Sequence, residues 1–155
     1  MHEVHVTIDI NAPVERVFDL ISDHATFLTG NGATCRLIKE GGESRNGTGA
    51  IREVVAGSMR FEEAILAFDV PKRYDYKIVK LTSGGKERPL EHDRGWVTFQ
   101  PTGSGTRVDW YTRYRVTVPV LGWFIERWVI APTMRPKFLA YLERAKERLE
   151  SSRSG

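Results

Sequence analysis

Four polar side chains stand among apolar residues in segments that alternate like β-strands: Glu63, Tyr76, His92 and Tyr114. Carboxyl, phenol and imidazole groups serve as general acids and bases in proteins. Desolvation disfavours the charged form of a carboxyl, so Glu63 in an apolar pocket is suited to act as an acid near neutral pH. These four are the candidate catalytic residues. No pair of them forms a recognisable catalytic signature, and strand parity turns His92 outward unless its strand is bulged.

Glu63 shares one face of its strand with Phe61 and Ile65, because side chains two residues apart point the same way. An unpaired buried polar group costs about 1–3 kcal/mol, so a dry core would not hold several carboxylates and phenols. Apolar walls with a few convergent polar groups are typical of a small-molecule site. The alternative is an ordinary packed face in which Glu63 pairs with Arg52 or Arg60.

Other chemistries lack their signatures. His2 and His5 are three residues apart on a strand, which points them to opposite faces, and no further Cys or His adjoins them, so no metal site is predicted. The chain has no G-x-S-x-G motif. The glycines of residues 41–49 lack the lysine and the following helix of a phosphate-binding loop and therefore predict turns. Cys35 is interpreted as a small buried hydrophobe, and no cofactor is predicted.

The bulk composition is that of one globular domain. The 155 residues, 41% of them hydrophobic, predict a single domain over residues 1–150 and a disordered tail over 151–155. The net charge is +3, but acids and bases interleave near the C-terminus as on a solvated helix, so nucleic-acid binding is not expected. No apolar run approaches the ~20 residues that cross a bilayer, and no signal peptide is recognisable. We therefore expect a soluble, cytoplasmic protein.

The strands and helices that must position these side chains are predicted from changes in the spacing of apolar residues along the chain. Residues 3–10 alternate as a strand, Pro13 opens a helix with an apolar stripe, and a second short helix ends near residue 28. Further strands are predicted at residues 35–39, 50–55, 59–68, 74–81, 91–100 and 107–118. Trp96 and Tyr111 should pair on the outer face of the last hairpin. Pro132 is expected to kink or break the long C-terminal helix.

This order of strands and helices resembles that of the Bet v 1-like, START-related (SRPBCC) superfamily, which includes bacterial polyketide cyclase/dehydrase and lipid transport proteins. The matching pieces are IDINAPVERVFDLISD at residues 8–23, Glu63-Ala64-Ile65, DVPKR at 69–73 and GTRV at 105–108. The resemblance implies an α+β helix-grip fold. In that fold a curved, seven-stranded antiparallel sheet wraps a long C-terminal helix, here Pro-kinked, and two short helices follow strand one. It also implies an apolar cavity between the sheet and the long helix.

The resemblance and the strand parity together imply binding or transport of a hydrophobic small molecule of lipid, polyketide or isoprenoid type. The candidate ligand-binding residues are Phe27, Ile51, Met59, Phe61, Glu63, Tyr74, Tyr76, Val97, Phe99, Trp110, Tyr114, Phe124, Trp128, Met134 and Phe138. The same parity places Glu53, Glu91 and Asp93 on the inward face. Phe124 and Trp128 begin the last helix, where the cavity of this superfamily often opens. They are candidates for gating ligand access or for transient membrane contact, without stable insertion.

Two other functions compete with a carrier. Some relatives cyclise or dehydrate polyketides, which would use Glu63 and a tyrosine as cavity acid–base groups. Other relatives bind proteins through the exterior of the sheet. The surface for this is the outward row of the longest strand, whose ordinary interpretation is a solvated strand face: Arg107, Asp109, Tyr111, Arg113 and Arg115.

Overall fold

The computed structural model describes residues 1–117 and 131–152. Its elements are β1 (His2–Ile10), α1 (Val14–Ser22), α2 (His24–Phe27), β2 (Ala33–Lys39), β3 (Ile51–Ala56), β4 (Met59–Asp69), β5 (Arg73–Ser83), β6 (Lys86–Glu87), β7 (Leu90–Pro101), β8 (Thr106–Val116) and α4 (Ala131–Ser151). All seven expected strands are present. The two-residue β6 was not expected, because so short a segment shows no alternation.

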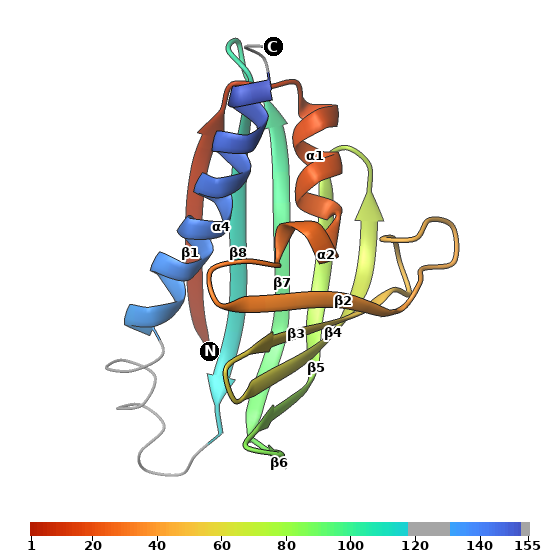
Figure 1. Ribbon diagram of the computed structural model, residues 1–155, viewed down its shortest axis with the longest axis vertical. Coiled ribbons are helices and arrows are strands. Elements are labelled where there is room, and N and C mark those ends of the chain that lie inside the picture. Colours follow the sequence, from red (N-terminus) through yellow and green to blue (C-terminus); the bar gives the residue numbers. More distant parts are fainter. Residues whose placement is uncertain (118–130, 153–155) are drawn as a thin grey trace.

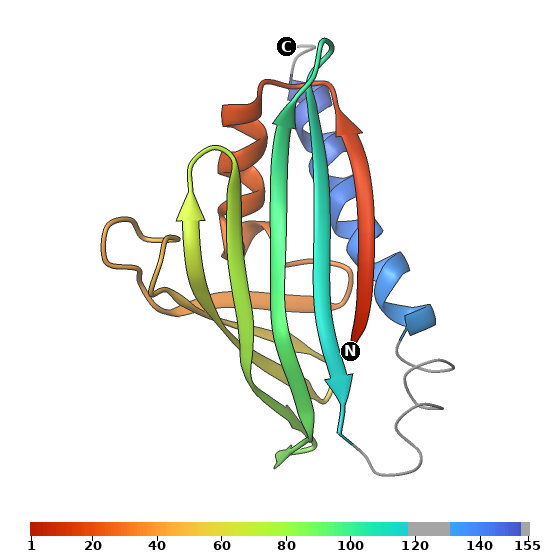
Figure 2. The ribbon, with the colours of Figure 1, turned by 180° about the vertical axis from the view of Figure 1, so that it is seen from behind.

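The strands form one antiparallel sheet in the order β1-β8-β7-β5-β4-β3-β2, with β6 paired to β5. The sheet curves so strongly that β2 crosses in front of the long central strands (Figure 1). Seen from behind, α1 and α4 both lie on the far, concave side of the sheet (Figure 2). The fold is therefore the expected α+β helix grip, in which a curved sheet encloses the C-terminal helix.

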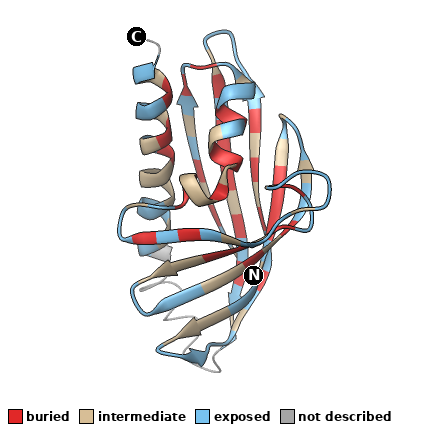
Figure 3. Ribbon diagram, turned by 45° about the vertical axis from the view of Figure 1, so that its right-hand side comes forward, coloured by how far each residue is buried: buried red, intermediate tan, exposed pale blue. Residues whose placement is uncertain are grey.

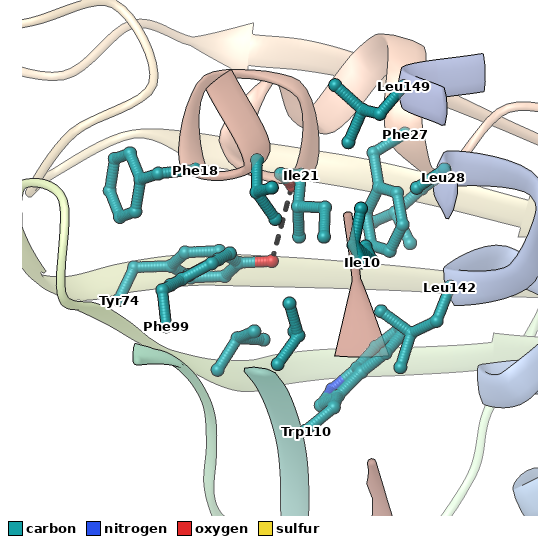
Figure 4. Packing of buried hydrophobic residues seen from close by; sticks show 14 of the residues in the cluster. Ile10, Phe18, Ile21, Phe27, Leu28, Tyr74, Phe99, Trp110, Leu142 and Leu149 are labelled. Carbon is teal, nitrogen blue, oxygen red and sulfur yellow. Dashed lines mark hydrogen bonds between the residues drawn. The ribbon is translucent and has the colours of Figure 1, made fainter. Parts of the chain in front are cut away.

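One end of the concave side is closely packed, and we call it the packed half. Here α1 lays its buried stripe of Val17, Phe18 and Ile21 on the sheet. The ring centroid of Phe18 lies 4.9 Å from that of Phe99, edge to face, and the hydroxyl of Tyr74 points at the carbonyl of Ile21 (Figure 4). The abrupt change from strand to helix near residue 12 thus provides the cover for this end of the sheet.

The long helix α4 is fixed to the other elements through basic side chains. Lys146 Nζ donates to the carbonyl of Asp9 on β1 at 2.7 Å, and Arg144 donates to the carbonyl of Phe27 at 2.7 Å. Pro132 lies in the first turn of α4, where its missing N–H needs no partner. The expected kink there adjoins residues 118–130, which are outside the described part of the chain. Ser151 belongs to α4 and not to a tail.

The outer face of the sheet consists of side chains that pair locally. Trp96 and Tyr111 stack with ring centroids 4.9 Å apart, which confirms the expected cross-strand pair. Arg107 binds Asp109 at 3.0 Å, and Arg113 binds the carboxylate of Glu3 at 2.7 Å. Within the described residues, the charged side chains of the row therefore have local partners, as on a solvated strand face.

Candidate ligand cavity

A cavity of about 410 Å³ lies between α4 and the part of the sheet away from α1. Its volume falls within the range of small-molecule sites. We call this end of the molecule the cavity half; its residues are less completely buried than those beneath α1 (Figure 3). The described residues that line it are Leu28, Arg52, Val54, Ala56, Met59, Phe61, Glu63, Tyr76, Ile78, Leu81, Leu90, His92, Trp110, Thr112, Tyr114, Thr133, Met134, Lys137, Phe138 and Tyr141.

The deepest charged group of the cavity is Arg52, whose side chain is only 1% exposed. The β3–β4 register sets Arg52 directly opposite Glu63, and its Nε donates to Glu63 Oε2 at 2.5 Å. Glu63 is thus paired with Arg52, as predicted by the alternative interpretation in which Glu63 binds Arg52 or Arg60 on a packed face. A buried ion pair of this kind is strongly disrupted when one partner is removed, because the other charge is left uncompensated.

His24 completes the shell around Arg52. The Nη1 group of Arg52 donates to His24 Nδ1 at 2.9 Å, and the opposite ring nitrogen, Nε2, lies 3.0 Å from the carbonyl of Asn46. Burial, together with the positive charge of Arg52, lowers the pKa of His24 to about 3. The ring is therefore neutral and carries its proton on Nε2, so that Nδ1 is available to accept from the guanidinium.

Tyr76 lies in the wall next to this ion pair. The guanidinium carbon of Arg52 is 4.6 Å from the centroid of the Tyr76 ring, and the Tyr76 hydroxyl accepts a hydrogen bond from Trp110 Nε1 at 2.9 Å. The ring fits only because residue 95 is glycine, since a Cβ there would overlap it. Burial raises the pKa of Tyr76 and the nearby Glu63 raises it further, so the phenol keeps its proton.

His92 faces the cavity because β7 has a bulge. The pairing of β7 with β8 shifts register between His92 and Arg94, which reverses the parity of the residues before the bulge. His92 Nδ1 accepts from the backbone N–H of Ile78 at 2.9 Å, and Nε2 lies 2.7 Å from Thr112 Oγ1. Burial lowers the pKa of His92 to about 4, so the ring is neutral, with both nitrogens engaged.

The apolar wall is mainly aromatic. Trp110 of β8 and Phe138 of α4 stack with ring centroids 4.0 Å apart, which joins the sheet to the helix across the cavity. Phe27 packs against the Trp110 ring from the side of the core, at a centroid distance of 5.7 Å. Exposed residues of the lining include Met59, which is 39% exposed, and Lys137.

The structure brings together part of the expected ligand-binding set. The expected residues that line the cavity are Met59, Phe61, Glu63, Tyr76, Trp110, Tyr114, Met134 and Phe138. Four others, Phe27, Tyr74, Val97 and Phe99, are instead buried in the hydrophobic core. Phe18 of α1 packs on Tyr74 and Phe99, and Phe27 packs on Trp110 and Tyr141. Phe124 and Trp128 lie outside the described residues.

The parity assignments of β3 and of the start of β7 were wrong. Ile51 and Glu53 face away from the cavity, since Arg52 and Val54 of the same strand line it. Glu53 accepts a hydrogen bond from Arg36 Nε at 2.9 Å on that other face. The carboxylate of Glu91 lies 3.8 Å from Arg115 on the outer face of the sheet.

Asp93, at the bulge in β7, is likewise exposed and not directed inward. The cause is the same reversal of parity that turns His92 toward the cavity.

Sequence reasoning missed several lining residues, of which Arg52 is the most consequential. A signal for it exists: Gly57-Ser58 is a two-residue turn, which sets Ala56 opposite Met59 and, by counting back, Arg52 opposite Glu63. The same count sets Val54 opposite Phe61, and Thr112 shares the parity of Trp110 and Tyr114. The remaining missed residues have no comparable signal: Leu28, Leu81, Leu90, Thr133, Lys137 and Tyr141.

No metal-binding group was found among the residues that the structure describes: nowhere in 1–117 and 131–152 do three His, Cys, Asp or Glu side chains gather closely enough to hold an ion. In the same residues no helix has the length and apolar character needed to cross a membrane.

The chain is similar to a known protein family in sequence and to several solved structures in fold. The family model described as polyketide cyclase / dehydrase and lipid transport matches residues 1–150. The crystal structure of TTHA0849 from Thermus thermophilus is similar at 22% identity and a TM-score of 0.71, covering 97% of this chain and 99% of that one. That of Ara h 8.0201 is similar at 15% identity and a TM-score of 0.69, covering 97% and 98%.

DynU16, a protein of the dynemicin biosynthetic locus, is similar at 16% identity and a TM-score of 0.65 over 97% of this chain and 48% of that one. No curated protein matches the sequence. At these identities the solved structures establish the fold that the chain shares with them.

Proposed function

The chain belongs to the polyketide cyclase/dehydrase and lipid transport family, and on that premise we propose that it binds a hydrophobic small molecule in the cavity between α4 and the sheet. The observation that carries the proposal is the cavity of about 410 Å³ in a molecule whose opposite end is closely packed. Protein interiors normally close such spaces, because unfilled volume forfeits packing contacts. Space of this size with aromatic walls suits an apolar guest.

Binding is favoured over catalysis by the state of the polar groups. A general acid or base must reach a reacting atom. Both ring nitrogens of His92 already have partners, and Glu63 is tied to Arg52. These contacts hold the cavity wall in place, and the Tyr76 phenol keeps its proton because burial raises its pKa, so among the described residues the polar groups of the cavity are suited to binding more than to proton transfer. The proposed activity is therefore to hold or carry the guest.

The neutral fluorescent probe N-phenyl-1-naphthylamine tests this proposal. The variant Val54→Phe adds a ring on the cavity face of β3, and Val55→Phe adds the same ring one residue later, on the opposite face of that strand. We expect saturable one-to-one binding by the unmodified protein, a loss of about tenfold or more in affinity for Val54→Phe, and little change for Val55→Phe. Absence of saturable binding, or an equal loss in both variants, would refute the proposal.

Native mass spectrometry supplies an independent measurement. Gently purified protein should show an added mass that is reduced in Val54→Phe and retained in Val55→Phe. Thermal unfolding of both variants checks that each remains folded before its affinity is interpreted.

A further inference from the structure

At the buried end of the cavity, Glu63 and Tyr76 each retain hydrogen-bonding capacity beyond their contacts with the described residues. Among the described residues, Glu63 Oε2 receives Arg52, while no donor reaches its Oε1. The Tyr76 oxygen accepts from Trp110 Nε1, and the phenolic hydrogen itself has no acceptor there. Since a phenol both donates and accepts, this pair of residues offers a guest one donor, the Tyr76 hydroxyl, and one acceptor, the Glu63 carboxylate.

The charges at this end of the cavity cancel. The positive charge of Arg52 is compensated by Glu63, and the nearby histidine rings are neutral because burial lowers the pKa values of His24 and His92. A guest carboxylate has no proton to donate to Glu63 and would be repelled by it. A guest ammonium has no lone pair with which to accept from Tyr76. Glu63 therefore disfavours a guest carboxylate, and a guest ammonium leaves the Tyr76 donor unused.

From these contacts we infer that the guest carries a neutral hydroxyl group at its inner end, which donates to Glu63 and accepts from Tyr76. The apolar remainder lies along Trp110 and Phe138 toward the opening of the cavity. A hydroxyl is a compact neutral group with both capacities. This inference rests on the proposed binding function and specifies its ligand class: a hydroxylated apolar molecule, such as a phenol or a long-chain alcohol, and not a free fatty acid.

Four probes with one ring system test the inference: 2-naphthol, 2-methoxynaphthalene, 2-naphthoate and naphthalene. The methyl ether accepts but cannot donate, so its comparison with 2-naphthol isolates the bond to Glu63. Naphthalene lacks both capacities, so its comparison with the ether isolates the bond from Tyr76. By isothermal titration calorimetry, 2-naphthol should bind about tenfold more tightly than the ether, the size of one good hydrogen bond. The naphthoate should bind most weakly.

Variants assign each preference to a residue. Tyr76→Phe keeps the Arg52–Glu63 pair and should weaken 2-naphthol and the ether by the same factor, without changing naphthalene. Glu63→Gln should reduce the preference for 2-naphthol over the ether. Its matched control is Glu62→Gln, the adjacent residue on the other face of β4, which should leave the preference intact. Glu63→Gln leaves the buried charge of Arg52 without its partner and could therefore destabilise the protein. The Tyr76→Phe variant and the four-probe series test the inference independently of the Glu63→Gln variant.

The outcomes separate this inference from the function on which it rests. Equal affinity for 2-naphthol and its ether, or tightest binding of the naphthoate, overturns the hydroxyl assignment and leaves the binding function standing. Failure of all four probes, naphthalene included, overturns both. A Tyr76→Phe effect as large on naphthalene as on 2-naphthol overturns the role of the Tyr76 hydroxyl, because it shows a packing defect.

Discussion

Tyr74 and Tyr76 are two residues apart on β5, on the same face and almost equally buried, yet they serve different regions of the molecule. Tyr74 is covered by α1 and belongs to the packed half, where Phe18 and Phe99 surround it. Tyr76 faces α4 across open space in the cavity half. The comparison shows that the residue type and the strand do not decide whether a face is core or cavity. The element that lies opposite decides it.

The largest expected effect comes from removing an aromatic ring in each half. Phe18→Ala empties a closely packed site and should lower the free energy of unfolding by about 3–5 kcal/mol. Phe61→Ala removes the same ring from a wall that already borders open space, so the cost should be only about 1 kcal/mol. Urea unfolding monitored by circular dichroism measures both values. Equal losses would show that the cavity half is as solid as the packed half.

The next effect concerns the ion pair that distinguishes the cavity half. Arg52→Met leaves Glu63 uncompensated and should lower the free energy of unfolding by about 3 kcal/mol. The double variant Arg52→Met/Glu63→Leu removes both charges and should recover most of that loss. Urea unfolding of the two variants gives the comparison. If the double variant is no more stable than the single one, the charges contribute nothing and the loss lies in packing alone.

The smallest effect, taken for one histidine over one pH unit, compares His24, whose ring lies 5.3 Å from that of Tyr74 in the packed half, with His92 in the cavity wall. The pKa values of His24 and His92 are lowered by burial to about 3 and about 4, whereas the unfolded chain has the ordinary value of 6.5. Below pH 6.5 the unfolded state therefore binds protons that the folded state does not. Stability is full above that pH and should fall by about 1 kcal/mol per pH unit for each histidine.

Urea unfolding between pH 7 and pH 5 measures this slope, and His92→Gln should roughly halve it. Imidazole resonances followed by NMR should show neither ring protonating in this range. A His92 ring that titrates near pH 6.5 would mean that the cavity half is open to water at that position, and the contrast between the two halves would then be one of hydration.

Much of the secondary structure follows from local periodicity. The change from alternating to helical spacing around Pro13, the seven main strands and the Trp96–Tyr111 pair are all short-range patterns, because side-chain direction repeats every two residues on a strand and about every 3.6 on a helix. The same patterns identify one face of most strands. They predicted Phe61, Glu63, Tyr76 and Trp110 on the concave face, where the structure has them.

The tertiary structure alone decided which part of that face is left open. The alternation of side chains along β5 predicts that Tyr74 and Tyr76 point to the same face. It does not predict that α1 covers Tyr74 while Tyr76 lies beside a cavity. A single bulge reverses parity, which turned His92 inward and Glu91 outward against expectation. Arg52 is buried where Glu63, its partner across the β3–β4 hairpin, and His24, from a helix on the other side of β2, both bind it. Local spacing determines the direction of a side chain; the space it meets depends on elements brought together from across the chain.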